Sequence, residues 1–504
     1  MDWSWNSIIP TATLESLREL MVFNPQEPMI FSSGLFLFLF TAFVLIYGIM
    51  RKWVNARILY VAAFSLLFYY KSSGVYFWLL IFASVSDYTL AQYIHASKSA
   101  KIRKLFVALS VMINLGMLGY FKYTNFFIEI ANGMFGAGFL DFQNIFLPVG
   151  ISFFVFQSLS YTIDIYRGNI KPLDRWIDYL FYLSFFPQLV AGPIVRAKDF
   201  IPQIRKPLYV SKEMFSGAIF LIATGLFKKA IISDYISLNF VDRVFDEPLL
   251  YSGFEALMAI YGYALQIYCD FSGYSDMAIG IALLLGFHFP ANFNAPYKSA
   301  TITEFWRRWH ISLSSWLRDY LYISLGGNRK GEGRTYLNLL ITMLLGGLWH
   351  GAAVRFILWG ALHGVALAIH KLWMKVIPWA KGEGAEMNIL FRVVGILLTF
   401  NVVCFGWLMF RADDMATVSA MLHQIMYSFN SELIPQVLSG YRLIFTMIAL
   451  GFILHMLPHR LSDWTRTQIS KVPLWAQVAV VVVVVWMVMQ IKSSDIQPFI
   501  YFQF

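Results

Sequence analysis

The chain alternates long apolar runs with short polar stretches along most of its length. A helix needs about 20 mostly apolar residues to cross a bilayer. The pattern therefore predicts an all-α, polytopic membrane protein with about 11 membrane segments, and the shorter runs suggest partial or re-entrant helices. The apolar runs cover residues 29–50, 58–70, 75–94, 105–130, 145–165, 215–232, 254–271, 277–289, 337–349, 352–369, 389–410, 443–457 and 475–490.

Charged residues between the runs predict their orientation, because cytoplasmic loops of membrane proteins are rich in Lys and Arg. Residues 1–28 hold four acidic residues and one arginine, so we expect the N-terminus outside. Arg51, Lys52 and Arg57 follow the first run and indicate the cytoplasm. Residues 298–334 are too polar to span and predict a long basic loop on the cytoplasmic side.

Two segments break the simple alternation. Residues 180–194 have basic residues on both flanks, which favours a segment that enters the membrane and returns. The runs at 337–349 and 352–369 also start and end beside basic residues, so they predict a hairpin with Trp349 and His350 at its tip. Neither an internal repeat nor a low-complexity linker divides the chain, and we treat residues 1–504 as a single membrane domain.

Composition narrows the class of protein further. Of 504 residues, 58% are hydrophobic and only 13% charged, whereas soluble domains carry about 25% charged residues. The net charge of +10 fits the excess of Lys and Arg that cytoplasmic loops of membrane proteins carry. The sequence shows no basic patch on a soluble surface, so nothing indicates nucleic-acid binding. Two cysteines, both in apolar segments, suggest neither a disulfide framework nor a CxxC metal site, and the first residues lack the basic start of a signal peptide.

Ionisable side chains at membrane depth are expensive and mark candidate functional sites. The strongest is His350, in the stretch GGLWHGA, where Gly347 and Gly351 have the GxxxG spacing that allows close approach of another backbone. An imidazole between packed helices, away from water, stays neutral and suits a general base. A hydrogen-bonded packing role for His350 is an equally open alternative at this point. His363, in a second GxxxG, is more typical of packing.

A second candidate, His310, lies in the stretch EFWRRWHISLS, which is typical of one interfacial helix. Trp306 and the neighbouring Trp309 suit the headgroup level of a membrane. Arg307, Arg308 and Arg318 are suited to an anionic group such as a phosphate of coenzyme A. The alternative is an anchor that binds lipid phosphate, with a structural role for His310. Ser314 belongs to the same candidate site.

Asp270 and Asp276 flank the polar stretch FSGYS after an apolar run. Such a stretch at depth predicts a helix break that faces a polar cavity, and a paired-carboxylate acid–base site is the alternative. Gln157, Asp164, Gln188 and Gln266 are further candidates for lining the same cavity. No HExxH or similar spacing joins the histidines, so we expect no metal site. GxSxG, Walker A and GxGxxG motifs in a strand–helix setting are absent as well.

Several motifs together resemble the membrane-bound O-acyltransferase family, in particular its bacterial branch that serves O-acetylation of alginate and similar exopolysaccharides. They are LPVGISF and QSLSYTID from residue 147 to 164, FPQLVAGP at 186–193, DFSGYSD at 270–276, the stretch from Glu304 to Arg329, GLWHG at 347–351 and PFIYFQF at 498–504. The dense part of the match covers about residues 145–365.

The resemblance implies an enzyme that moves an acyl group from a cytoplasmic thioester donor through a central tunnel. It implies that His350 is the catalytic histidine and His310 the second characteristic one, with Trp349 beside them. The expected donor is acetyl-CoA or another acyl thioester, with no tightly bound cofactor. The expected partners are an extracytoplasmic SGNH-type acyltransferase, membrane lipids and, indirectly, a polysaccharide acceptor.

The sequence therefore predicts a multi-pass O-acyltransferase of the bacterial inner membrane that acts in exopolysaccharide O-acetylation. Within the family, transfer of D-alanine from a carrier protein to teichoic acid is one alternative, and peptidoglycan as acceptor is another. A transporter or flippase is an alternative of a different class, but transporters are usually built on internal repeats.

Overall fold

Helices dominate the part of the chain that the computed structural model describes, which comprises residues 21–25, 28–376, 388–491 and 499–500. No strand occurs within these ranges, so the predicted all-α class is confirmed. The chain divides into two compact units. Unit 1 consists of Met1–Gly116, Phe146–Val190 and Ile201–Pro207, and unit 2 consists of Met117–Ile145, Ala191–Phe200 and Leu208–Phe504.

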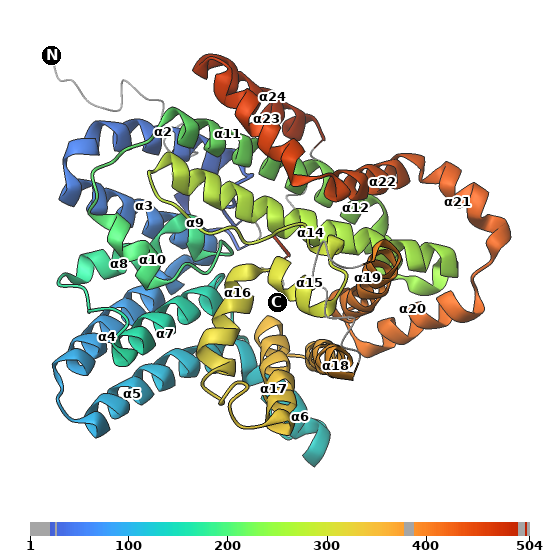
Figure 1. Cartoon of the computed structure of the whole chain (residues 1–504), viewed down its shortest axis with the longest axis horizontal. Coiled ribbons are helices and arrows are strands. Elements are labelled where there is room, and N and C mark those ends of the chain that lie inside the picture. The colour runs from blue at the N-terminus through green and yellow to red at the C-terminus, as the bar shows by residue number, and fades with distance from the viewer. Residues whose placement is uncertain (1–20, 26–27, 377–387, 492–498, 501–504) are drawn as a thin grey trace. The chain divides into compact units, whose positions relative to one another are not determined.

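Unit 1 is built around α4, which packs against α7 and α8 (Figure 1). α9 is fully buried and α8 is buried from Asp178 to Ser184, but with four and nine residues both are too short to span a bilayer. This agrees with the expectation that residues 180–194 enter and return. The helices of unit 1 are α2 (Gly34–Ile49), α3 (Val54–Ser73), α4 (Phe77–Ala96), α7 (Ile151–Arg167), α8 (Trp176–Ser184) and α9 (Phe186–Leu189), while α5 (Ala100–Leu118) and α10 (Ala197–Ile204) cross the unit boundaries.

A buried carboxyl group ties the helices of unit 1 together. Asp87 on α4 is fully buried and accepts hydrogen bonds from Ser110 (2.5 Å) and Asn114 (2.7 Å) on α5 and from Ser158 on α7. Tyr179 on α8 extends the network through Ser158 at 2.8 Å. Buried polar groups are costly unless they are hydrogen-bonded, so this network fixes how the helices pack.

α7 starts at a glycine for a steric reason. Gly150 has φ 77°, and a Cβ there would lie 2.6 Å from the carbonyl oxygen of Leu189. Only a residue without a side chain allows both this left-handed conformation and this approach. Gly150 therefore sets where α7 begins against the end of α9.

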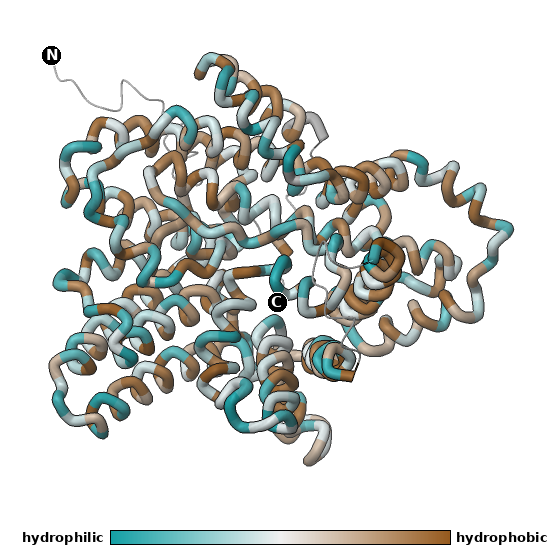
Figure 2. The backbone as a smooth tube through the Cα atoms, viewed as in Figure 1, coloured by the Kyte–Doolittle hydropathy of each residue, from teal (hydrophilic) through white to brown (hydrophobic). Residues whose placement is uncertain are grey.

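Unit 2 holds two closely packed helix pairs, α11 with α14 and α17 with α18 (Figure 1). Hydrophobic positions run through the helices, and hydrophilic ones gather mainly at turns and helix ends (Figure 2). The helices of unit 2 are α6 (Thr124–Phe135), α11 (Lys212–Leu226), α12 (Asp234–Ile236), α13 (Asp242–Asp246), α14 (Gly253–Leu284), α15 (Ile302–Arg308), α16 (Ile311–Trp316), α17 (Glu332–His350), α18 (Val354–Val376), α19 (Ile389–Arg411), α20 (Met415–Tyr427), α21 (Ile434–Gly440), α22 (Arg442–Met456), α23 (His459–Lys471) and α24 (Leu474–Ile491).

The predicted helix break between Asp270 and Asp276 is wrong. α14 is one continuous helix of 32 residues, and it begins with a capping box between Ser252 and Glu255. Neighbouring lysines make the break unnecessary. Lys229 lies 2.5 Å from Asp270, and Lys228 lies 2.7 Å from Asp276. Both carboxylates are thus paired with lysines, and α14 stays helical through the polar stretch.

Six helical stretches in the described ranges are long and apolar enough to cross a membrane, or up to seven if the bent pair α21–α22 counts as one span. The stretch Val54–Ala96 contains two of the predicted runs, and Ala100–Phe135 is similarly long. The expected number of about 11 segments stays a prediction. So does the outward N-terminus, because residues 1–20 and 26–27 lie outside the described ranges.

Replacing Asp87 tests whether its network holds unit 1 together. Asp87→Leu leaves the partners of the carboxyl group buried without an acceptor, so we expect it to lower the free energy of unfolding by about 2–5 kcal/mol. Asp87→Asn keeps one acceptor and should cost less. Thermal unfolding in detergent measures both, with Asp141→Leu in an exposed loop as control. An unchanged melting temperature for Asp87→Leu would contradict this role.

Candidate functional site

The hairpin of α17 and α18 brings two backbones into direct contact. A Cβ on Gly347 would lie 2.1 Å from the carbonyl oxygen of Phe356, and one on Gly360 would lie 2.3 Å from that of Met343. Both GxxxG motifs therefore mark close helix contact, as predicted. α17 ends at His350 and α18 begins at Val354, so the predicted tip is confirmed.

His350, the last residue of α17, is buried among aromatic rings with only 4% of its surface exposed. The centroid of its ring lies 4.9 Å from that of Trp349, 4.9 Å from that of Trp359 and 5.2 Å from that of Phe410. These rings hold the imidazole in one place and keep bulk water away from it.

His310 lies at a break between α15 and α16, so the single interfacial helix expected over this stretch is wrong. Its backbone is left-handed, with φ 41° and ψ 56°, and its side chain is fully buried. Such a conformation is uncommon for a residue with a side chain and needs support from its surroundings. Trp309 is also buried, and Trp306 packs against Trp359 and His363 at 5.7 and 5.2 Å, so neither is a simple headgroup anchor.

Asn292 supplies that support. The backbone carbonyl oxygen of Asn292 accepts a hydrogen bond from the backbone N–H of Ile311 (2.9 Å). The side-chain Oδ1 of Asn292 accepts one from the hydroxyl of Ser312 (2.9 Å) and lies 3.2 Å from Nδ1 of His310. A hydrogen bond donated by Nδ1 favours the tautomer whose Nε2 carries the lone pair. Asn292 stands 18 residues before His310, and no motif in the sequence linked the two.

The structure brings the two histidines together next to one indole. The ring of Trp349 lies 6.3 Å from that of His310 and 4.9 Å from that of His350. The ring of Phe271 on α14 lies 4.6 Å from that of His310. We call His310, Trp349 and His350 the histidine cluster. The sequence placed both histidines 40 residues apart, and only the fold makes them neighbours.

The last turn of α17 is held by two side chains that sequence analysis missed. Lys122 Nζ donates to the carbonyl oxygens of Trp349 (2.7 Å) and His350 (2.9 Å), and the hydroxyl of Tyr123 donates to that of Leu348 (2.7 Å). These carbonyls have no partner within the helix, and a cation at a helix C-terminus is favourable. The missed signal was a lysine inside the apolar run 105–130, since a charge there is a functional candidate by default.

The candidate arginines do not form a free cationic cluster. Arg308 pairs with Glu304 at 2.8 Å, and Arg318 pairs with Asp319 at 2.7 Å, whereas the side chain of Arg307 is exposed. Burial alone would raise the pKa of Asp319, but hydrogen bonds from Arg318 and Arg196 hold it below its ordinary value. Binding of an anionic donor by these arginines stays a prediction.

The other candidates have mixed outcomes. The hydroxyl of Ser314 donates to the carbonyl oxygen of Trp309 at 3.1 Å, which gives it a local structural role. Asp270 and Gln266 line one polar cavity, as expected, but Asp276 is not among the described residues that line it. Gln157, Asp164 and Gln188 are buried in unit 1, and their relation to that cavity stays a prediction.

His363 has the packing role that its sequence context suggested. It is fully buried, and its ring packs against those of Trp359 at 4.7 Å and Trp306 at 5.2 Å. Neither ring nitrogen has a hydrogen-bond partner among the described residues. His363 therefore packs as an aromatic ring against Trp359, which in turn contacts His350.

Comparison with known proteins gives a consistent result. The family model of membrane-bound O-acyltransferases matches residues 66–410. The "Probable alginate O-acetylase AlgI" of Pseudomonas putida is 37% identical over 94% of this chain and 100% of its own length. A peptidoglycan O-acetyltransferase of Helicobacter pylori is 35% identical over 78% of this chain and 79% of its own. A teichoic acid D-alanyltransferase of Bacillus subtilis is 29% identical over 53% of this chain and 69% of its own.

Two glycines on α17 provide a matched test of the hairpin contact. Gly347→Ala forces its Cβ into the backbone of α18, so we expect a loss of about 1–3 kcal/mol in stability. A Cβ on Gly333 has no atom within 4 Å, and Gly333→Ala should be neutral or slightly stabilising. Thermal unfolding compares the two variants. Equal melting temperatures would show that α17 and α18 do not meet at Gly347.

Proposed function

The chain belongs to the membrane-bound O-acyltransferase family, and from that premise we propose that it transfers acetyl groups toward a cell-surface polysaccharide such as alginate. It is a multi-pass membrane enzyme. The proposed donor is acetyl-CoA or another acyl thioester on the cytoplasmic side of the bacterial inner membrane. The single observation that carries the mechanism is the position of His350, buried at the tip of a helix hairpin where the ring of His310 lies near the same indole, Trp349.

The proposed chemistry is general-base catalysis by His350. The neutral imidazole of His350 takes the proton of the acceptor hydroxyl while the hydroxyl oxygen attacks the thioester carbonyl carbon. The C–S bond then breaks, an ester forms, and the proton passes to the leaving thiolate. Positioned proton transfer of this kind contributes about 10²–10⁴-fold to the rate. The surrounding rings of Trp349, Trp359 and Phe410 limit competing hydrolysis of the thioester because they exclude water.

His310 is assigned a supporting role in the same step. Its Nδ1 lies 3.2 Å from Asn292 Oδ1, which fixes the ring and leaves Nε2 as the basic nitrogen. The rings of both histidines lie near the indole of Trp349, so an acyl thioester bound beside this indole would be close to both imidazoles.

The donor and the partner follow from the same proposal. Arg307 is exposed in the polar region between residues 298 and 334, on the side where an anionic coenzyme A would arrive. An extracytoplasmic SGNH-type acyltransferase is the proposed partner that passes the acetyl group to the polymer.

Acetyl transfer is favoured over D-alanyl transfer by the pattern of similarity. The alginate O-acetylase relative aligns over nearly the whole chain, whereas the D-alanyltransferase relative aligns over about half of it at lower identity. Peptidoglycan O-acetylation is the second candidate, and the relative from Helicobacter pylori supports it. A transporter function is set aside, because the family consists of O-acyltransferases.

Removal of the proposed base should abolish transfer and leave the fold intact. We expect His350→Ala to lower the transfer rate by at least about 10²-fold. His310→Ala should reduce it less, because it acts beside the base. His288→Ala, at an exposed position, is the control. Release of thiol from acetyl-CoA and labelling of the polysaccharide measure the rate, and melting temperature verifies folding. Full activity of His350→Ala would contradict the assignment.

Lys122 should act through the position of His350. Lys122→Met removes the two hydrogen bonds to the end of α17, so we expect kcat to fall by about tenfold while KM for the donor stays near its original value. Lys122→Arg keeps a cation at the helix end and should restore most of the activity. Lys101→Met, at an exposed position, is the matched control. A changed KM with unchanged kcat would instead place Lys122 in donor binding.

A further inference from the structure

α23 (His459–Lys471) is a short polar helix between the apolar helices α22 and α24, and the chemistry described above gives it no role. Pro458 precedes it and Pro473 follows its end, so both neighbouring helices stop before it or start after it. Its 13 residues rise about 20 Å, which is less than the hydrocarbon core of a bilayer, about 30 Å. Three Lys or Arg side chains make it too polar to cross as well. α23 therefore belongs at a membrane surface.

Loop charge and contacts indicate that this surface is the cytoplasmic one. α23 packs against α11, and the contact at Gly217 lies near the start of α11. Residues 196–212, which lead into α11, hold five Lys or Arg and one acidic residue, as is typical of a cytoplasmic loop. The end of α22 gives a second indication, because Lys298 Nζ donates to the carbonyl oxygen of Leu457 at 2.5 Å. Lys298 begins the basic loop that is also expected in the cytoplasm.

A glycine of α11 fixes which side of α23 faces inward. The guanidinium group of Arg466 lies against the backbone of Gly217, where a Cβ would come within 2.5 Å of its Nη2. Thr465 and Ile469 are partly covered and lie on neighbouring positions of the same side of the helix. The remaining face of α23 points away from α11.

This outer face carries an aromatic residue between two cations. Arg460, Trp464, Thr467 and Lys471 follow one another at intervals of four, three and four residues, so they form one line along the helix. All four are exposed, and Trp464 exposes 59% of its surface. Leu461, next to this line, is 45% exposed. We call Arg460, Trp464, Thr467 and Lys471 the α23 stripe.

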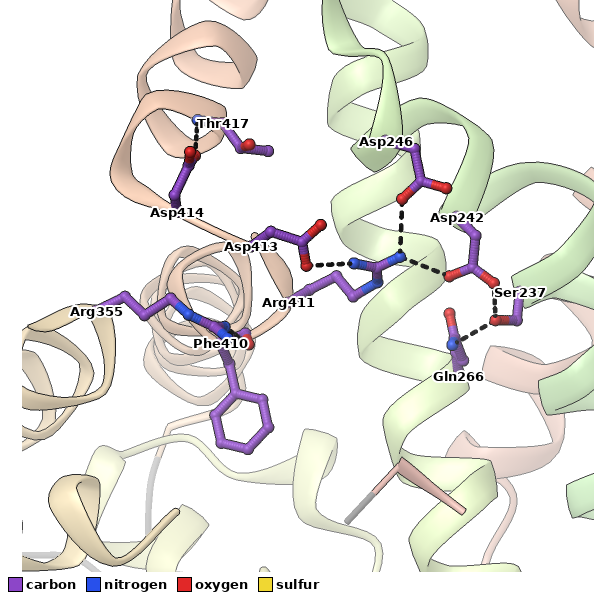
Figure 3. A network of polar contacts seen from close by, with 10 residues as sticks. All are labelled: Ser237, Asp242, Asp246, Gln266, Arg355, Phe410, Arg411, Asp413, Asp414 and Thr417. Atoms are coloured by element: carbon purple, nitrogen blue, oxygen red, sulfur yellow. Dashed lines mark hydrogen bonds and ion pairs between the residues drawn. The ribbon is translucent and has the colours of Figure 1, made fainter. Parts of the chain in front are cut away.

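The cations of the α23 stripe are not neutralised by carboxylates. Neither Arg460 nor Lys471 takes part in an ion pair with a described residue, Asp463 of the same helix included. Lys471 Nζ has only a long hydrogen bond of 3.5 Å to the amide oxygen of Gln468. Arg411, at the end of α19, shows the opposite situation, because three aspartates engage it (Figure 3). The stripe thus presents positive charge that is available to an anionic partner.

Anionic phospholipid is the partner that fits both the charge and the aromatic residues. Exposed indoles are typical of the headgroup level of a membrane, where one end of the ring is apolar and the other wet. Trp475, four residues beyond Lys471, is 76% exposed and adds a second indole where the chain returns to an apolar helix. An acidic soluble protein would account for the cations but not for two exposed indoles beside an apolar helix. Each basic residue near an anionic membrane surface strengthens binding about fivefold.

We propose that α23 binds anionic phospholipid headgroups of the cytoplasmic leaflet through the α23 stripe. Arg460 and Lys471 contact lipid phosphates, and the indole of Trp464 lies at the boundary between headgroups and acyl chains. The inference goes beyond the proposed acyl transfer and does not depend on it, because it requires only that the chain lie in a membrane.

Fluorescence quenching by labelled lipids tests the lipid preference at the stripe itself. Thr467→Cys provides the attachment point for a bimane fluorophore, in the full-length protein with the two buried native cysteines, Cys269 and Cys404, replaced by alanine. The protein is placed in phosphatidylcholine nanodiscs that contain a low fraction of nitroxide-labelled lipid, either phosphatidylglycerol or phosphatidylcholine with the same label on the acyl chain. We expect the phosphatidylglycerol to quench at least about threefold more strongly, because the cations enrich it locally.

Matched variants make this result specific to the stripe. Arg460→Gln combined with Lys471→Gln should bring the ratio of quenching by the two lipids close to one. Lys101→Gln combined with Lys104→Gln, at exposed positions of α5, removes the same charge elsewhere and should leave the ratio unchanged. A bimane on Val483→Cys, at an exposed position of the apolar α24, should be quenched equally by both lipids.

Two further measurements complete the experiment. Leu461→Cys, also exposed, serves as a second reporter if Thr467→Cys does not fold, and the melting temperature verifies folding of every variant. His350→Ala should keep the full ratio, so the result separates this inference from the proposed function.

Three outcomes would overturn the inference. The first is equal quenching by the two lipids at position 467. The second is a preference for phosphatidylglycerol that survives the loss of Arg460 and Lys471. The third is weak quenching by both lipids, which would show that the stripe faces water or a soluble partner.

Discussion

The contact between α17 and α18 is the constraint on which the site depends. Glycines at 347 and 360 let the two helix backbones touch, and this contact places His350 at the tip of a hairpin and buries it under Trp359 and Phe410. The end of α17 is then held by Lys122 and Tyr123. A general base inside a membrane protein has to be both neutral and immobile, and this arrangement provides both conditions.

Elsewhere the protein meets the cost of buried polar groups by pairing them locally. Asp87 is surrounded by hydroxyl and amide donors, and Asp270 is matched by Lys229. α14 therefore crosses its polar stretch FSGYS as one helix, although the sequence alone favoured a break. The polar residues remain available to the cavity without any loss of backbone hydrogen bonds.

Local patterns were sufficient to predict the helical class, the hairpin tip and the candidate histidines. The GxxxG spacing carried that information because close backbone approach needs small residues at fixed intervals. The break at His310 was not predictable, since Asn292, 18 residues earlier, supports it through tertiary hydrogen bonds. Lys122 was visible as a charge within an apolar run, but its target, the end of α17, lies more than 200 residues away. Contacts over such separations are set by the tertiary fold and produce no periodic pattern in the sequence.

The central claim is that the imidazole of His350 meets the acyl thioester inside the protein. A cryo-EM structure with a non-hydrolysable acetyl-CoA analogue tests it most directly. The account predicts the analogue's carbonyl carbon beside His350, with space for a hydroxyl oxygen within about 3 Å of a ring nitrogen and within about 3.5 Å of that carbon. An analogue bound with its acyl group remote from His350, or separated from it by the aromatic rings, would contradict the account.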